Sequence, residues 1–365
     1  MVDRLGCPAS HYTVKLHHMG GRHPFARVRT GVAEVTWSRE LDAVSEAQVV
    51  IARQVIDADC DRQLRRLRPW AHELTLYRAG DSQPVWQGPI TLTERTRTTY
   101  TITARDLAAW LEVRTNPESY EWTDIDLVAV ARRLVRMGLT GGTRPDPNFW
   151  PHCLFDPTGI DTDREQARTY AVPIKDELDA LCDQGMDYTV TRRRLWCFPE
   201  PTIATPAQGR LTHNDIVDEL SLVVDGDQTA TRWIVEGQTG DGDRVRAIEG
   251  EVDQYYGLIE RAVRAENART ERACRNVART RLRYSRRPPV MVTVPDGAAL
   301  HPRAPITIDQ LIPGTRWDIS LVDWLDDTTT PSKLTRVSVT AEPSKREQVA
   351  VSFVPIGSDE VQEVV

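Results

Sequence analysis

Alternating apolar and polar residues in the first third of the chain constrain its fold more than any other feature. In HELTLY (72–77), Leu74 and Leu76 alternate with Glu73 and Thr75, and PVWQGPITL and TYTITARD repeat the same period of two. This period is typical of a half-buried β-strand. The turn RAGDSQ, with Gly and Asp at its tip, joins the first two runs and indicates a β-hairpin.

One of these predicted strands contains its own interruption. Gly88 and Pro89 follow Trp86 after a single glutamine. Proline has no N–H to donate to a strand ladder, so Pro89 favours an edge, a bulge or a crossing point. Glycine permits a sharp change of direction at bulges. We therefore expect this strand to bend at Gly88 and Pro89.

A helical period replaces the strand period in the middle of the chain. Residues 123–139 place apolar side chains along one helical stripe: Leu127, Val130, Ala131, Leu134 and Met137. Thr123 or Asp124 can cap the start of this predicted helix, and Gly138 can end it. A loop rich in Pro and Gly follows.

A second helix and a hairpin complete the middle segment. Pro173 opens IKDELDALCD, and Gly185 stops it. MDYTV and RLWCF then form a hairpin over the turn TRRR, within residues 186–198. The middle segment is thus predicted to be a small α+β unit.

From about residue 204 the strand pattern returns. ATRWIVEG and RVRAIEGEV flank a hairpin turn, and a helix is expected through about 258–283. Four further strands are predicted: 290–294, 316–322, 334–340 and 348–353. The predicted fold is mainly β with an α+β insertion, and two similar antiparallel β-barrels in one chain fit this order.

These patterns give predicted domain boundaries. They are 1–112 for a first β-barrel, 113–203 for the α+β insertion, 204–357 for a second β-barrel and 358–365 for an acidic tail. Within the third range, residues 204–235 are an alternative completion of the first barrel.

Composition excludes several classes of protein. The formal charge of −7 argues against nucleic acid as the main partner. No stretch reaches the roughly 18 apolar residues of a membrane span, and the N-terminus lacks the apolar segment of a signal peptide. Six scattered cysteines without a CxxC pair do not make a disulfide framework. We expect a protein made in the cytoplasm with free thiols.

No motif for catalysis, a cofactor or a metal emerges. The chain has no GxSxG and no HExxH, and GQTGDGD lacks the residues and strand–turn–helix context of a phosphate loop. His11, His17, His18 and His23 crowd the N-terminus. Their spacing matches no standard zinc pattern, so solvent-facing or interface histidines are favoured over a metal site. We expect no catalytic, cofactor or metal centre.

Residues 261–287 hold ten arginines against only two glutamates. A DNA-facing helix is one interpretation. Apolar residues recur at helical spacing in the same segment, for example Ala273, Val277 and Leu282. A helix with one buried face and an arginine-rich solvated face is therefore the favoured alternative.

The order of motifs resembles the tail-tip hub proteins of long-tailed bacteriophages, with actinobacteriophage minor tail proteins most similar. In that family a strand ending in W-x-G-P follows a hairpin, and the next strand runs into an Asp that opens a short helix. The matching residues are Trp86, Gly88, Pro89 and Asp106.

The second half of the chain resembles the second barrel of the same hubs. There a Tyr-Gly pair precedes a helix, a Pro-led strand follows, and a Leu-x-Pro-Gly turn feeds the next strand. The matching residues are Tyr256, Gly257, Pro289, Leu311, Pro313 and Gly314. The likeness covers most of residues 25–355, and the order and spacing of the motifs carry it.

The resemblance implies a structural virion protein. Such a hub is a homotrimer whose six barrels form a ring that adapts the sixfold tail tube to a threefold tip. It implies a place at the virion tail tip, contacts with a distal tail ring protein, the tape measure protein and tip or fibre proteins, and DNA only in transit. A tail-associated cell-wall hydrolase and a carbohydrate- or receptor-binding module are the alternatives.

The hub hypothesis also predicts an electrostatic arrangement. A channel that lets DNA slide has to be neutral or acidic, because each phosphate that an arginine neutralises adds affinity. The arginines of 261–287 are therefore expected to pair with carboxylates of the trimer or of a neighbouring tail protein.

Overall fold

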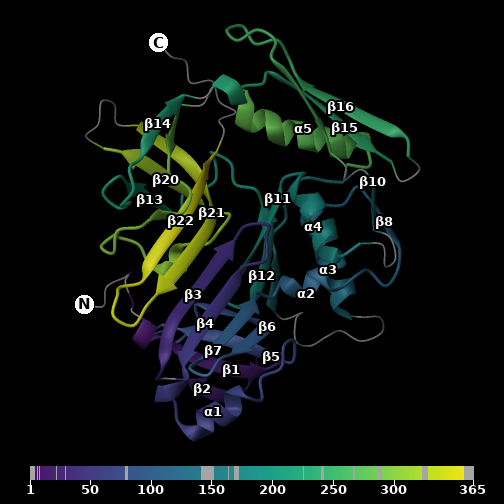
Figure 1. Ribbon diagram of the computed structural model, residues 1–365. Helices are drawn as coiled ribbons and strands as arrows, with labels where there is room; N and C mark the ends of the chain where they lie inside the picture. Colours follow the sequence, from purple (N-terminus) through teal and green to yellow (C-terminus); the bar gives the residue numbers. More distant parts are fainter. Residues whose placement is uncertain are drawn as a thin grey trace.

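The computed structural model divides the chain into a large strand-built body, a helical insertion beside it, and a small sheet-and-helix unit above both (Figure 1). The described residues are 5, 7, 9–21, 23–28, 30–78, 81–140, 152–162, 164–167, 172–224, 226–239, 242–265, 268–286, 290–322 and 328–356.

The first part is antiparallel β, as predicted, and it holds two short helices, of which only the one near residues 106–111 was expected. Its strands are β1 (Thr13–His18), β2 (Pro24–Val28), β3 (Val32–Glu40), β4 (Glu46–Ala52), β5 (His72–Tyr77), β6 (Trp86–Arg95) and β7 (Thr99–Arg105). The helices are α1 (Ala58–Leu64) and α2 (Ala109–Glu112). Alternation of buried side chains along β4 and β7 confirms the period read from the sequence.

The last part returns to the same sheet. Its strands are β13 (Gly209–Thr212), β14 (Ser221–Val224), β18 (Val290–Thr293), β19 (Ala298–Ala299), β20 (Arg316–Leu321), β21 (Thr328–Ala341) and β22 (Gln348–Pro355). All of these except β14 and β18, which pair with each other, join the first part in a sheet of 12 strands.

The two halves meet through the pairing of β3 with β21, from Arg336 opposite Glu40 to Ala341 opposite Val35. The main path of the sheet runs β13-β20-β21-β3-β4-β7-β6-β5-β1-β2. Among the described residues no pairing closes either half into a barrel. The mainly β fold is confirmed, but the two predicted barrels are not seen: most described strands of the first and last parts join one continuous sheet of 12 strands, and β14 and β18 form a separate pair.

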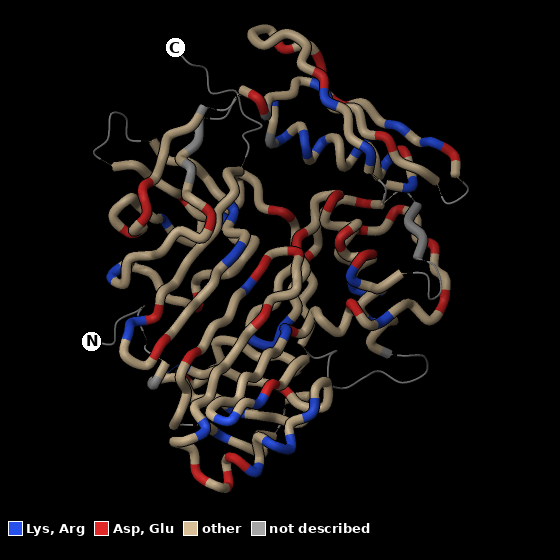
Figure 2. The backbone as a smooth tube through the Cα atoms, viewed as in Figure 1, with Lys and Arg blue, Asp and Glu red and all other residues tan. Residues whose placement is uncertain are grey.

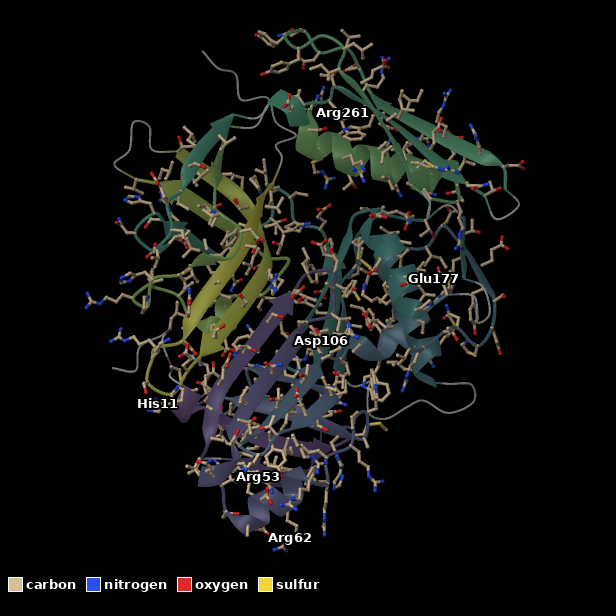
Figure 3. The ribbon with its side chains drawn as sticks, viewed as in Figure 1. His11, Arg53, Arg62, Asp106, Glu177 and Arg261 are labelled. Atoms are coloured by element: carbon tan, nitrogen blue, oxygen red, sulfur yellow. The ribbon has the colours of Figure 1, made fainter. Side chains whose placement is uncertain are left out.

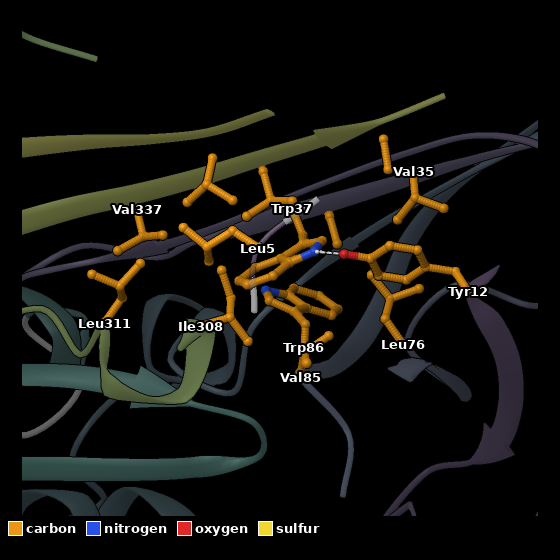
Figure 4. Packing of buried hydrophobic residues seen from close by; sticks show 14 of the residues in the cluster. Leu5, Tyr12, Val35, Trp37, Leu76, Val85, Trp86, Ile308, Leu311 and Val337 are labelled. Atoms are coloured by element: carbon orange, nitrogen blue, oxygen red, sulfur yellow. Dashed lines mark hydrogen bonds between the residues drawn. The ribbon is translucent and has the colours of Figure 1, made fainter. Parts of the chain in front are cut away.

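One hydrophobic core fills this body. Trp37 and Trp86 lie against each other, with Ile308, Leu311 and Val337 from the last part around them (Figure 4). The indole N–H of Trp37 donates to the hydroxyl of Tyr12 at 3.2 Å. The first and last parts of the chain are therefore held together by shared apolar packing as well as by strand pairing.

The insertion packs around a second hydrophobic core, which Leu107, Ala108 and Leu111 at the end of the first part also join. Its elements are β8 (Tyr120–Thr123), α3 (Leu127–Thr140), β9 (Cys153–Phe155), β10 (Arg164–Ala167), α4 (Ile174–Cys182), β11 (Met186–Thr191) and β12 (Arg194–Pro199). Strands β11, β12 and β9 form one sheet, and β10 pairs with β8.

The predicted boundaries of α3 were wrong in two ways. The helix begins at Leu127, and the carboxylate of Asp126, rather than Thr123 or Asp124, accepts the N–H groups of its first turn at 2.9 and 3.3 Å. Gly138 lies inside the helix instead of ending it. A Cβ at Gly138 would lie 1.5 Å from Cδ1 of Ile174, so this glycine allows α4 to pack closely on α3.

A third unit lies apart from the large sheet. It consists of β15 (Arg232–Gln238), β16 (Arg244–Gly250), β17 (Glu260–Arg264) and α5 (Glu271–Ser285), with a core of its own. The helix expected through about 258–283 was placed too early, because β17 occupies its first part and the Thr270 side chain caps the helix at Ala273 N–H, at 3.0 Å. The predicted range 204–357 thus contributes strands to separate sheets.

Candidate functional site

Strand β6 bends where the sequence predicts. Residues 86–89 pair with β5, whereas residues 90–95 pair with β7, so the strand changes partner directly after Pro89. Pro89 lies opposite Glu73, and a bulge follows between Ile90 and Leu92. Bending at this point lets one strand belong to two stretches of sheet.

Gly88 is required at this crossing. A Cβ on Gly88 would lie 1.9 Å from the carbonyl oxygen of Arg105, at the end of β7. Backbone cannot move aside as a flexible side chain can, so any larger residue would push β6 away from β7. The preceding Trp86 is 2% exposed and fills the core beneath the bend.

Asp106 is the other resemblance residue of the first half, and it lies where the strands meet the insertion (Figure 3). Its carboxylate is buried and accepts hydrogen bonds from Ser45 N–H (2.8 Å), Ser45 Oγ (2.5 Å) and Ala108 N–H (2.8 Å). Burial raises the pKa of Asp106 to about 6, against the lowering effect of these donors. The residue anchors the turn from β7 into α2.

The turn-forming residues of the second half divide between two places. Gly314 has a φ of 86°, donates its N–H to Leu334 at 2.7 Å and leaves room for the ring of Phe198. Leu311 is fully buried in the shared core, close in sequence to Pro313. Pro289 lies outside the described residues.

Tyr256 and Gly257 belong instead to the third unit. Both follow Asp253, whose side chain accepts the Tyr256 N–H at 3.1 Å, and Gly257 has a φ of 68°. The element that follows them is the strand β17, not a helix. These two residues therefore do not come together with the others that the resemblance singled out.

Within the core, Arg39 connects the start of β6 with the segment around Leu311. Its guanidinium donates to the carbonyl oxygens of Val85 (3.0 Å), Ile308 (2.9 Å) and Leu311 (3.0 Å). The sequence analysis did not identify Arg39. A signal was available, because the period of two in VAEVTWSRE places Arg39 on the same strand face as Val35 and Trp37.

The turn TRRR attaches the insertion to the first part. Arg193 donates from Nε and Nη2 to the two carboxylate oxygens of Glu73, each at 2.8 Å, and both side chains are buried. Gly20 N–H and Gln87 Nε2 also donate to Glu73, each at 2.9 Å. The insertion's hairpin thus docks at the bend of β6, where Gln87 N–H also meets Arg192 O at 3.2 Å.

A second buried contact joins the insertion to β21 and to the end of β3. Lys333 Nζ lies 2.6 Å from Glu200 and 3.4 Å from Asp187. Asp42 accepts the Tyr188 N–H at 2.8 Å. Burial raises the pKa of Asp42 to about 6 and also raises that of Asp187. The insertion is therefore fixed to the first and last parts of the chain by buried polar contacts as well as by packing.

Three arginines of α5, and Arg286 directly after it, form ion pairs with carboxylates of other elements of this chain. The ion pairs are Arg272 with Asp124 (2.7 Å), Arg275 with Glu249 (3.3 Å), Arg279 with Glu249 (3.4 Å) and Arg286 with Glu251 (3.5 Å). Figure 2 shows basic residues along α5 and acidic residues on the neighbouring strands. The opposite face of α5, with Ala273 and Val277, is buried. This arrangement agrees with the favoured interpretation of the segment.

Histidines are candidate metal ligands, and exposed tryptophans would suit a carbohydrate-binding site. In the described part of the chain no three His, Cys, Asp or Glu side chains are grouped to hold a metal ion. His18 packs with Phe25 and His72.

Of the tryptophans that the structure describes, none is exposed, which favours core packing over sugar binding. No helix in the described ranges has both the length and the apolar character of a membrane span.

Comparison with known proteins gives structural matches only. Neither a protein-family model nor a curated protein matches the sequence. The 43 kDa tail protein of prophage MuSo2 from Shewanella oneidensis aligns with 94% of this chain and 98% of its own, at a TM-score of 0.55 and 14% identity.

Two further solved structures are similar to the same extent. The tail protein from Neisseria meningitidis MC58 covers 95% of this chain and 97% of its own, with a TM-score of 0.55 and 14% identity. The prophage tail protein gp18 from Listeria monocytogenes EGD-e covers 93% of this chain and 94% of its own, with a TM-score of 0.54 and 12% identity. Along nearly its whole length, this chain has the fold of phage tail proteins.

Proposed function

We propose that the chain is a structural component of a bacteriophage tail, and specifically a tail-tip hub protein of the type found in actinobacteriophages. One observation carries the proposal: three tail proteins share the fold over more than nine-tenths of both chains. The proposed role is non-enzymatic and uses no cofactor or metal.

The proposed assembly is a homotrimer in which the two β halves of each chain act as two barrels of a six-barrel ring. A bent strand in each half supports this arrangement. Strand β6 changes partner after Pro89, and β21 pairs with β20 through Lys333 and with β3 from Arg336. Such bends let short sheets curve around a small core.

In this proposal the ring closes the tail tube and adapts its sixfold symmetry to a threefold tip. The proposed location is the tail tip of the virion, after synthesis in the host cytoplasm. The proposed partners are a distal tail ring protein, the tape measure protein and tip or fibre proteins, and DNA passes through during ejection. Pairing of the α5 arginines within the chain supports transit without tight binding, because paired arginines are less available to phosphates.

Antibody labelling tests the proposed location. Antibodies against the purified chain, applied to particles of the phage that encodes it, should label the tip of the tail in negative-stain images. Labelling of the capsid or along the whole tube would contradict the proposal. A zymogram of the purified chain on host cell walls should show no clearing, and a cleared zone would favour the hydrolase alternative.

A further inference from the structure

A cavity of about 670 Å³ lies where the insertion meets the two β halves. Its wall includes Arg39 from β3, Arg192, Arg193 and Arg194 from the β11–β12 turn, Gln87 from β6, and Asp309 from the last part of the chain. Two of these arginines hold parts of the chain together, Arg193 through its buried ion pair with Glu73 and Arg39 through backbone carbonyls. Arg192 and Arg194 are less buried than these two.

The charges in this wall do not balance. Glu73 is engaged by Arg193. The carboxylate of Asp309 forms ion pairs with two arginines, at 3.3 Å from Arg192 and 4.0 Å from Arg39. Arg194 is exposed and has no ion pair within the described residues. Among the described residues that line the cavity, four arginines therefore stand against one carboxylate, that of Asp309, with Glu73 behind the wall and Asp81 close enough to act on Arg192.

Arg39 adds an unmet hydrogen-bond donor. Its side chain is 2% exposed, and its two terminal nitrogens are occupied by backbone carbonyls. Its Nε is buried without a hydrogen-bond partner. A buried donor without a partner is unfavourable, because it has lost its hydrogen bonds to water. Carbonyl oxygens also neutralise a buried cation less completely than a carboxylate would.

We propose that this cavity is a binding site for an oxyanion, namely a carboxylate or phosphate group. The planar guanidinium fork matches both anions with two parallel hydrogen bonds. A cavity of this volume lies within the usual range of ligand sites, roughly 300–1,000 Å³. The bound group comes either from a small free anion or from an acidic side chain presented by another protein segment.

The experiment uses the full chain and two probes in calorimetric titrations at low salt. Inorganic phosphate represents the free anion, and glutarate represents the carboxylate of an acidic side chain. Tighter binding of phosphate indicates a free phosphate as the ligand, and tighter binding of glutarate indicates a carboxylate such as that of an acidic side chain. Binding of either probe is expected to weaken about three- to tenfold in Arg194→Gln, which removes one positive charge from the wall.

Asp309→Asn provides a test of opposite sign. Removing this carboxylate frees Arg192 and increases the positive charge of the wall, so binding should tighten by a similar factor. Arg62→Gln is the matched control, because Arg62 lies on α1 at the bottom of the view in Figure 3, is not among the residues that line the cavity, and pairs with Asp59. It should leave binding unchanged.

Three results would overturn the proposal. They are no binding of either probe, equal weakening in Arg62→Gln and Arg194→Gln, and weaker binding in Asp309→Asn. Circular dichroism of each variant checks that it is folded. Since Arg194 is exposed and the side chain of Asp309 is 53% exposed, neither substitution disturbs the core.

Discussion

Replacing Arg193 by methionine should detach the insertion's hairpin from the bend of β6. The substitution keeps an unbranched apolar stem but removes the guanidinium that contacts both oxygens of Glu73. The Glu73 carboxylate would keep only the donors of Gly20 and Gln87. It would remain buried without a compensating charge.

The magnitude follows from burial. The side chains of Arg193 and Glu73 are 7% and 1% exposed, so water screens the pair little. Breaking a buried pair by removing one partner typically costs about 3–5 kcal/mol. Arg194→Met, one residue further on the same turn, removes an exposed arginine and should change the free energy of unfolding by less than about 0.5 kcal/mol.

Urea unfolding, followed by tryptophan fluorescence and circular dichroism, measures these free energies. The double variant Arg193→Met with Glu73→Gln should lose at least about 1 kcal/mol less than Arg193→Met alone, because no buried charge is left unpaired. Equal effects of Arg193→Met and Arg194→Met would refute the reasoning. Strictly additive effects in the double variant would refute it as well.

Two further predictions concern the bend and the residue beside it. Gly88→Ala should destabilise the fold by about 1–3 kcal/mol in urea unfolding, because its Cβ would collide with the Arg105 backbone. Gly226→Ala, whose Cβ would meet nothing within 4 Å, should be nearly neutral, and equal effects of the two substitutions would contradict this account. The pKa of Asp106 is raised to about 6 in the folded state, so its contribution to stability is present at low pH and is lost as pH rises from about 4 through about 6. Asp106→Asn should remove up to about 3 kcal/mol of this fall, measured by urea unfolding across that range, and an unchanged pH profile would contradict the assignment.

Local features of the fold could be predicted from the sequence. The steric properties of Gly88 and Pro89 are local, so the sequence around them predicts the bend of β6. The alternation of apolar and polar residues in β4 and β7 likewise predicts which faces of these strands are buried. Helix α4 begins at Ile174, directly after Pro173, as expected.

Contacts between distant segments could not be predicted in this way. The pairing of β3 with β21 joins strands about 300 residues apart, and neither strand's pattern identifies its partner. The same holds for the ion pair of Arg193 with Glu73, since a charged turn residue looks like any solvated residue in the sequence. The candidate site depends on these long-range contacts: the local period of two places Arg39 on the core-facing side of its strand, but it does not identify the carbonyls of Val85, Ile308 and Leu311 as its partners.

The mass of the purified chain in solution tests the central claim most directly. Three copies of the 41.3 kDa chain give a particle of about 124 kDa, which light scattering coupled to gel filtration distinguishes from a single chain. The hub proposal predicts the trimer mass, alone or within an isolated tail-tip complex. A mass of one chain in solution, together with a copy number other than three in isolated tails, would contradict it.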